Sequence, residues 1–222
     1  MSPEDSRVSY RYGTEDGSGT EIMEDYNDRG AYEYDGGWHG SWLPDEGMRA
    51  DFEEELRALW HTTSSLPAGR VLDVACGTGV LTQHLKGEVT GLDGSEEMLE
   101  IARERVLGAT FVRGNAFSIP FPDSSFDRVF TSNFYGLLLP EERTRFLREV
   151  RRVAPELVVM EVVEQDMKKL GWRKRETGWQ EHTLSDGSEH LIYRRYFTAK
   201  SLAGELGGEI LFDGEYFVAV AS

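Results

Sequence analysis

Residues 71–85 read VLDVACGTGVLTQHL. The first five form a short, nearly apolar run, as expected for a β-strand that is buried on both faces. Gly77 and Gly79 follow, and the pattern predicts that a helix begins near Gly79. Glycines after a strand let the backbone approach a ligand closely at the strand's carboxyl end. Asp73 lies at that end, where its carboxylate can hold a cationic amine.

Patterns typical of strands and helices alternate along the rest of the chain. Strands are predicted at 88–93, 110–114, 127–133 and 156–163, and helices at 49–61, 95–106, 140–153 and 199–206. For the last helix, Thr198 is the expected N-terminal cap, and Gly207 or Gly208 the expected stop. Repeated strand–helix–strand units with short loops indicate a parallel sheet with helices on both faces.

The last part of the chain contains two predicted β-hairpins. Residues 179–197 hold two β-prone runs around Asp186 and Gly187, and two more runs flank Asp213 and Gly214. A two-residue Asp-Gly loop permits only an antiparallel return. We therefore expect the parallel sheet to end in an antiparallel strand.

Polar residues follow the second and third predicted strands. Asp93 comes 20 residues after Asp73 and can accept hydrogen bonds from both hydroxyls of a ribose. After the third strand, Asn115 offers an amide to an adenine edge, and Ala116 offers a backbone N–H. Together these residues indicate a nucleoside that carries a cationic or zwitterionic tail.

A dinucleotide is the alternative ligand. The G-x-G-x-x-G pattern would need a third glycine at position 82, which is Thr82. The Asp73 carboxylate would also face a pyrophosphate unfavourably, whereas it suits an amine. The sequence therefore favours the nucleoside with an amine tail.

With these motifs the chain resembles the class I S-adenosylmethionine-dependent methyltransferases, in particular the group that acts on small molecules. The motifs are DVACGTG at 73–79, GLDGS at 91–95 and GNA at 114–116. Ala75 stands where a glycine is common, and Asn115 where an aspartate is usual. The resemblance implies a Rossmann-like α/β fold with a mostly parallel seven-stranded sheet, an antiparallel C-terminal strand and helices on both faces.

The resemblance implies S-adenosyl-L-methionine as the cofactor and S-adenosyl-L-homocysteine as its product. It places Asp93 on the ribose, Met98 against the adenine, and the backbone of Thr131 and Ser132 near the methionine amine. The implied cofactor-binding residues are Tyr34, Asp73, Ala75, Gly77, Thr78, Gly79, Asp93, Gly94, Met98, Asn115, Ala116, Phe117, Thr131 and Ser132.

The predicted reaction is methyl transfer to a small metabolite, an amine or a hydroxyl, by in-line displacement. A hydroxyl acceptor requires a general base, for which His39 and His182 are the candidates, and Asn133 is expected near the transferred methyl. An aromatic, glycine-rich flap at 22–44 and the hairpin at 179–197 are expected to form the acceptor pocket. The alternative is a protein that binds the cofactor without methyl transfer, either regulatory or catalysing a cyclisation or rearrangement.

The chain has 222 residues, with 24 Lys plus Arg, 40 Asp plus Glu and a net charge of −16. This charge argues against nucleic acid as a partner. One cysteine rules out a disulfide within the chain, and the scattered histidines lack the spacing of a metal site. Without a secretory signal or an apolar run of 18 residues, we expect a soluble, cytoplasmic protein without a membrane partner. The oligomeric state stays open.

Two regions are predicted from these patterns. Residues 1–66 comprise a flexible, acidic N-terminal tail, the aromatic flap and the first helix. Residues 67–222 form the cofactor-binding methyltransferase domain, with the hairpin at 179–197 as an insertion.

Overall fold

The computed structural model describes residues 46–163, 177–185 and 187–222. The predicted flap at 22–44, with its candidate site residues Tyr34 and His39, lies outside these ranges. The same is true of Asp186 in the predicted hairpin loop. For the flap and its two side chains, the sequence-based expectations therefore stay predictions.

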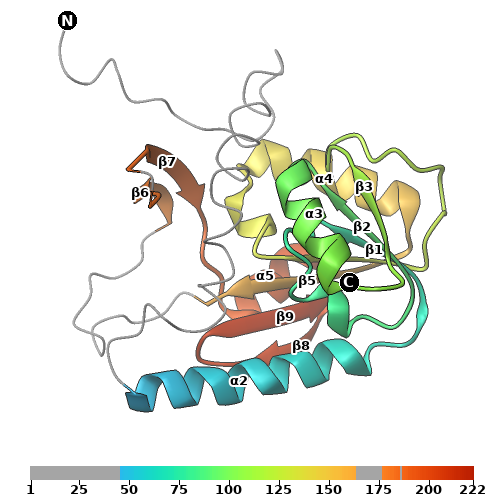
Figure 1. Ribbon diagram of the computed structural model, residues 1–222. Coiled ribbons are helices and arrows are strands. Elements are labelled where there is room, and N and C mark those ends of the chain that lie inside the picture. The colour runs from blue at the N-terminus through green and yellow to red at the C-terminus, as the bar shows by residue number, and fades with distance from the viewer. Residues whose placement is uncertain (1–45, 164–176, 186) are drawn as a thin grey trace, which may run out of the picture.

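A seven-stranded sheet forms the centre of the fold, in the order β3-β2-β1-β4-β5-β9-β8 (Figure 1). Its strands are β1 (Gly69–Val74), β2 (Gly87–Asp93), β3 (Thr110–Arg113), β4 (Arg128–Ser132), β5 (Glu156–Val162), β8 (Glu209–Asp213) and β9 (Phe217–Ala221). Neighbours from β3 to β5 pair in parallel, whereas β9 runs antiparallel to both β5 and β8. The predicted fold class, including the antiparallel C-terminal strand, is confirmed.

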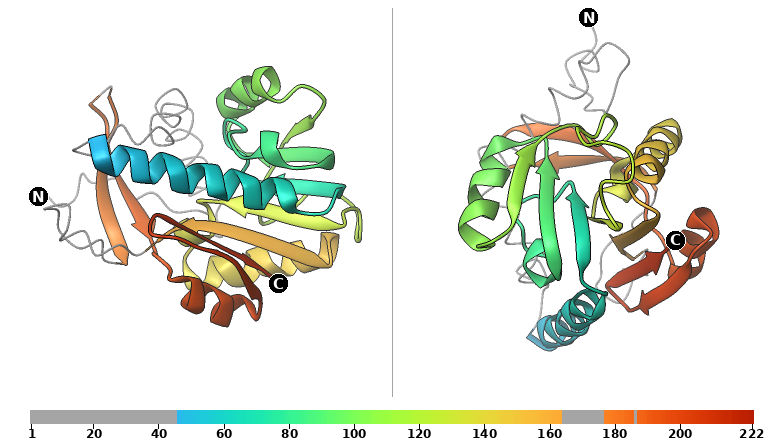
Figure 2. Two further views of the ribbon diagram at one scale, coloured as in Figure 1. Left: turned by 90° about the horizontal axis from the view of Figure 1, so that it is seen from below. Right: turned by 90° about the vertical axis from the view of Figure 1, so that its right-hand side faces the viewer.

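Helices cover both faces of this sheet (Figure 2). They are α2 (Glu46–Ser65), α3 (Glu96–Arg105), α4 (Pro140–Val153) and α5 (Ala199–Leu206), with short 3-10 helices η2 (Thr82–His84) and η3 (Tyr135–Leu137). On one face, α2 packs against the sheet through Phe52, Leu56 and Leu59. On the other face lie α4 and α5, whose buried residues include Phe146 and Leu202.

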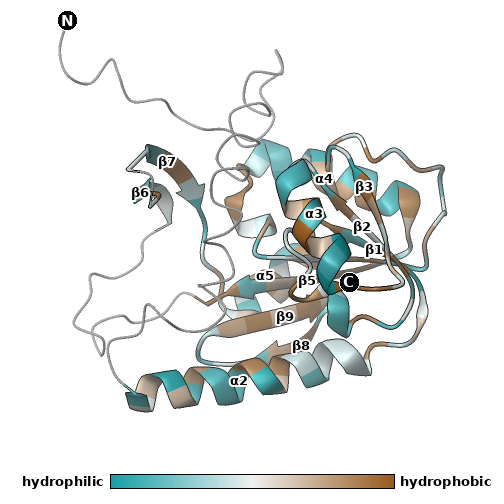
Figure 3. Cartoon of the chain, viewed as in Figure 1, coloured by the Kyte–Doolittle hydropathy of each residue, from teal (hydrophilic) through white to brown (hydrophobic). Residues whose placement is uncertain are grey.

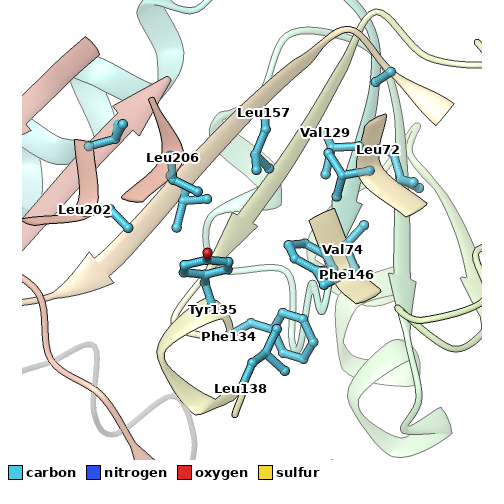
Figure 4. Packing of buried hydrophobic residues seen from close by; sticks show 14 of the residues in the cluster. Leu72, Val74, Val129, Phe134, Tyr135, Leu138, Phe146, Leu157, Leu202 and Leu206 are labelled. Atoms are coloured by element: carbon cyan, nitrogen blue, oxygen red, sulfur yellow. The ribbon is translucent and has the colours of Figure 1, made fainter. Parts of the chain in front are cut away.

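The central strands are buried on both sides, which explains their almost continuous apolar sequences. All five residues of β4 are buried. In Figure 3, β9 is coloured as hydrophobic along its length, whereas α2 shows hydrophilic and hydrophobic residues in turn. Figure 4 shows the cluster on the α4 and α5 face, where Phe146 lies beside Val74 of the sheet and Tyr135 lies near Leu202 and Leu206 of α5. Burial of this kind is the main favourable contribution to folding.

The predicted helix near Gly79 is wrong: the structure has only the 3-10 turn η2 between β1 and β2. The chain must return along the whole of β1, because Gly87 at the start of β2 pairs with Gly69. Six strand residues span roughly 20 Å. A seven-residue α-helix would span only about 10 Å, so most of the connection must run in a more extended form.

The hairpin predicted at 179–197 is present as β6 (Gly178–Thr183) and β7 (Glu189–Arg194), which form a separate two-stranded sheet (Figure 1). An isolated parallel bridge between Val163 and Phe197 joins the chain after β5 to the chain before α5. The hairpin therefore leaves and rejoins the main body at one place, next to the end of β5.

Helix α2 is attached to the β8–β9 turn by one carboxylate. Glu55 accepts three backbone N–H groups there, from Glu215, Tyr216 and Phe217, each at 2.8 Å. One carboxylate thereby serves three backbone donors of the turn. Hydrogen bonds to a charged group contribute more than neutral ones.

We expect Glu55→Ala to lower the free energy of unfolding by about 2–3 kcal/mol, because the turn loses its shared acceptor. Urea denaturation of the full chain measures this loss. Glu54→Ala is the matched control, since the neighbouring Glu54 side chain is exposed, and its effect should stay within about 0.5 kcal/mol. Equal stabilities of the two variants would contradict the role of Glu55.

Candidate cofactor site

The candidate residues of β1, β2 and β4 meet at one edge of the sheet, because parallel neighbours present their carboxyl ends on the same side. Asp73, one position before the end of β1, pairs with Gly91 of β2 and with Phe130 of β4, each two positions before its strand ends. Asp93 is the last residue of β2. The structure thus brings the two predicted acids to the same edge.

Asp73 is a buried carboxylate with only one of its oxygens paired. Its Oδ2 accepts a 2.6 Å hydrogen bond from the hydroxyl of Thr82, and its side chain is 1% exposed. Its Oδ1 is buried and has no hydrogen-bond partner among the described residues. Burial raises the pKa of the Asp73 carboxyl to about 7, and the nearby charge of Asp93 adds to this, while the Thr82 bond opposes it.

Asp93 holds the loop that follows β1. Its Oδ2 accepts the N–H of Gly77 at 2.8 Å, and its Oδ1 accepts the N–H of Ser95 at 3.0 Å. Each carboxylate oxygen can accept more than one hydrogen bond. Asp93 thereby joins the β1 loop and the start of α3 at the point where a ribose is expected.

The loop after β1 adopts left-handed backbone conformations. Ala75, Gly77 and Gly79 have φ of 57°, 53° and 77°. A side chain at Gly79 would also crowd Ala102 of α3. Ala75 carries the strain of a non-glycine residue in this region, which explains why glycine is common there in the family. Thr78, between the two glycines, is fully buried.

The N-terminus of α3 is the next part of the site. Ser95 caps the helix, since its Oγ accepts the N–H of Met98 at 3.1 Å. Met98 is buried, and the carbonyl of Gly94 accepts a hydrogen bond from the Arg113 guanidinium at 2.9 Å. These contacts fix the backbone where the resemblance expects the adenine.

Asn115, Ala116 and Phe117 follow β3 and are all half-buried. The Oδ1 of Asn115 accepts the N–H of Phe117 at 2.8 Å. This hydrogen bond closes a local turn and orders the segment. The NH₂ group of Asn115 takes no part in this turn.

The last candidates lie where β4 ends. Thr131 is fully buried, and its hydroxyl donates to the carbonyl of Val74 at 2.8 Å, which joins β4 to β1. Ser132 is also buried. Asn133 has a φ of 51°, and its buried Oδ1 has no hydrogen-bond partner among the described residues. Strained residues with unsatisfied polar atoms are typical of functional sites.

His182 lies on β6, outside the seven-stranded sheet. It pairs with His190 of β7, and its own side chain is exposed. His190 is buried, with its Nε2 at 2.8 Å from the hydroxyl of Ser188. The structure thus places His182 on the hairpin and not at the edge formed by β1, β2 and β4.

Two side chains of this region were not singled out from the sequence. In the sequence, position 82 mattered only as the third glycine that a dinucleotide motif would need. The structure shows that the Thr82 hydroxyl donates to Asp73. Glu161 of β5 was also missed, although a lone acid inside the apolar run at 157–163 is an available signal. It is 1% exposed.

Neither a metal cluster nor a membrane-spanning helix occurs in the ranges that the structure describes. There, no three side chains of His, Cys, Asp or Glu come together in a way that could hold a metal ion. None of the helices in those ranges combines the length and apolarity needed to cross a bilayer.

The edge residues fit the expected cofactor. The unpaired, buried Oδ1 of Asp73 needs a donor, and the ammonium of the methionine portion offers one. Asp93 ends β2, where the ribose is expected, and Gly77 and Gly79 carry no side chain that would block a ligand there.

Comparison with known proteins agrees with this fit. A family model described as a methyltransferase domain matches residues 71–156. A demethylmenaquinone methyltransferase from Thermotoga maritima is 40% identical over 108 residues, which cover 45% of this chain and 46% of that protein. The matched part therefore spans about half the length of this relative.

Solved structures resemble most of the chain. The structure titled "DhpI-SAH complex structure" has a TM-score of 0.66 and 24% identity, over 91% of this chain and 95% of that chain. The [4+2]-cyclase SpnF has a TM-score of 0.57 and 24% identity, over 92% of this chain and 77% of that chain. At these identities the likeness shows the fold.

The sheet order and the acidic residues at its carboxyl edge define a doubly wound α/β protein of the nucleotide-binding kind. The matched domain and the structural relatives are more specific. The methyltransferase domain matched at residues 71–156, the methyltransferase relatives and the fold together support a class I S-adenosylmethionine-dependent methyltransferase, as the sequence motifs predict.

Proposed function

We propose that the protein binds S-adenosylmethionine at the carboxyl ends of β1, β2 and β3 and transfers its methyl group to a small molecule. The single observation that carries this proposal is the pair of acids at one edge. Asp73 has a buried oxygen that needs a donor, and Asp93 lies where a ribose would bind. A pyrophosphate beside the Asp73 carboxylate would be repelled, so the pair suits a nucleoside with an ammonium tail better than a dinucleotide.

Each residue of the edge has a defined task in this proposal. Asp73 orients the amino-acid end through its ammonium, and Asp93 orients the ribose, while Asn115 donates to the adenine. When bound, S-adenosylmethionine supplies a methyl group on a sulfonium. The sulfur leaves as a neutral thioether, so the leaving group needs no proton. The chain therefore contributes mainly alignment and the exclusion of water.

The acceptor is proposed to be an amine or a hydroxyl. Asn133 supports this choice, because its Oδ1 is an unpaired acceptor at the end of β4, on the edge that carries Asp73. A nucleophile that carries an N–H or O–H can donate to that oxygen and be held in line. For a hydroxyl, His182 on the hairpin is the proposed general base.

Two other functions have specific support. The curated relatives named demethylmenaquinone methyltransferase suggest a quinone acceptor. These relatives match less than half of this chain, and the separate match to a methyltransferase domain ends at residue 156, before the hairpin β6–β7. The similarity to a [4+2]-cyclase favours the second alternative, a cofactor-binding protein without methyl transfer.

The test supplies the full chain with S-adenosylmethionine carrying a labelled methyl group and with three acceptor sets: primary amines, hydroxylated aromatics and a demethylated quinol. A broad metabolite extract forms a fourth arm. Label in an amine or hydroxyl product, with equal formation of S-adenosylhomocysteine, supports the proposal. Label in the quinol alone indicates the reaction named for the relatives. Tight cofactor binding with no label transferred in any arm would refute methyl transfer.

A further inference from the structure

A buried carboxylate at the end of β5 faces the turn that follows β4. Glu161 is 1% exposed, and its Oε1 accepts the N–H of Gly136 at 2.8 Å. Backbone N–H groups of Phe134 and Tyr135 also stabilise its charged form. The carboxylate thus holds the turn through the Gly136 N–H, and the preceding two N–H groups favour its ionised form.

Gly136 is enclosed between Glu161 and the end of the hairpin. Its carbonyl accepts the N–H of Arg195 at 2.7 Å. A Cβ atom built at Gly136 would lie 2.6 Å from the Arg195 carbonyl and 3.0 Å from the Glu161 Oε2. The turn is therefore held from two sides, by β5 and by the chain that leaves β7, at a separation that only glycine permits.

The same turn begins with Asn133. The N–H of Asn133 donates to the carbonyl of Met160 at 2.9 Å, and its φ is 51°. A left-handed asparagine persists only where its surroundings hold it. Since Glu161 directly follows Met160, two neighbouring residues of β5 hold both ends of the turn.

Charged groups near this turn come from several elements. They are Arg194 and Arg195 at the end of β7, Glu205 of α5, Arg143 of α4 and Tyr135 of η3. Glu205 is already engaged, with ion pairs of 3.2 Å and 2.8 Å to the two arginines Arg143 and Arg195 and a hydrogen bond from the Tyr135 hydroxyl. Arg194 remains as the main cation acting on Glu161.

No described residue forms an ion pair with Glu161, so burying it in charged form is unfavourable. Burial raises the pKa of its carboxyl to about 7, while the charge of Arg194 and the turn N–H groups oppose this rise. A neutral side chain would pack here at lower cost to stability. The carboxylate is therefore better explained by what it holds in place.

We propose that Glu161 is a positioning residue for methyl transfer: its carboxylate holds the 134–136 turn against the end of the hairpin and thereby sets the orientation of Asn133. Its catalytic meaning rests on the proposed function. The positioning itself is a property of the folded chain and can be tested without any turnover.

The test follows backbone amide and side-chain NH₂ signals by NMR, in the full chain saturated with S-adenosylhomocysteine, from pH 5.5 to 8.5. In the wild type, the Gly136 amide and the Asn133 side chain should shift together, with one midpoint near pH 7. In Glu161→Gln neither should titrate, and amide exchange at 134–136 should be about tenfold faster. Asp73→Asn should keep the Gly136 titration, which separates the two carboxyl groups.

Two further variants address folding and specificity. Gly136→Ala displaces the turn without removing the charge, so it should shift the Asn133 signals as Glu161→Gln does. Glu142→Gln is the matched control: its buried carboxylate accepts the N–H of Leu139, beyond the turn, and the titration at Gly136 should persist. Unchanged Asn133 signals in both Glu161→Gln and Gly136→Ala would overturn the proposal.

Turnover gives a separate measurement. With the acceptor that the labelling test reveals, Glu161→Gln should lower kcat about tenfold and leave the affinity for S-adenosylhomocysteine within about twofold. Equal losses in both quantities would contradict a positioning role on the acceptor side. If no methyl transfer is found, the proposed function fails, whereas the NMR result still decides whether Glu161 positions the turn.

Discussion

Asp93→Ala is expected to weaken the binding of S-adenosylhomocysteine by roughly 100-fold or more. Two ribose hydroxyls lose a charged acceptor, and each such bond is worth about 1.5–3 kcal/mol. The variant also frees the Gly77 and Ser95 N–H groups that the carboxylate holds, so the β1 loop and the start of α3 lose their common anchor. Isothermal titration calorimetry measures the dissociation constants.

Two variants separate the ribose contact from general damage. Asp93→Asn keeps the volume and one acceptor oxygen, so its loss of affinity should be intermediate. Asp127→Ala removes an exposed carboxylate that pairs with Arg70, at the start of β1, and should leave the affinity unchanged. A folded Asp93→Ala protein with a dissociation constant within threefold of the wild type would show that Asp93 does not bind the cofactor.

Asp73→Asn is expected to have opposite effects on stability and on binding. The carboxyl has a pKa of about 7 in the folded chain, against 3.8 as the ordinary value. The folded state therefore binds the proton more tightly, and the stability that the neutral form provides is lost as pH rises from about 4 through 7. A neutral asparagine avoids this loss, so the variant should be more stable than the wild type at pH 8, by up to about 4 kcal/mol.

Binding should change in the other direction. The ionised carboxylate is the form that attracts the ammonium, so the wild type should bind S-adenosylhomocysteine more tightly as pH rises through 7. Asp73→Asn should bind at least about tenfold more weakly. For 5′-methylthioadenosine, which lacks the amino-acid part, the two proteins should have equal affinities. Lower stability of the variant at pH 8, together with unchanged binding of S-adenosylhomocysteine, would contradict both the burial argument and the assigned contact.

Elements with strong local signals were predictable. The helix at 140–153 has the predicted bounds, because its apolar residues Phe146, Val150 and Val153 recur at helical spacing. The bounds of α5 are also as predicted, since Thr198 caps it and Gly207 ends it with a φ of 68°. In both cases the information lies within a few neighbouring residues.

The missed features depend on long-range geometry. A helix after Gly79 fails because β2 must begin beside Gly69, and the local glycine pattern does not contain that constraint. The partner of Glu161 is Gly136, which lies 25 residues earlier and meets it only through the β4–β5 pairing. The meeting of Asp73 and Asp93 at one edge of the sheet was predictable, because the motif spacing places both near the carboxyl ends of neighbouring parallel strands.

The most direct measurement is calorimetric titration of the full chain with S-adenosylhomocysteine and, in parallel, with NAD. Asp73 and Asp93 suit an ammonium and a ribose and oppose a pyrophosphate. We expect binding of S-adenosylhomocysteine with one site per chain, and none of NAD. Binding of NAD without S-adenosylhomocysteine would contradict the assignment of this edge to the methyl donor.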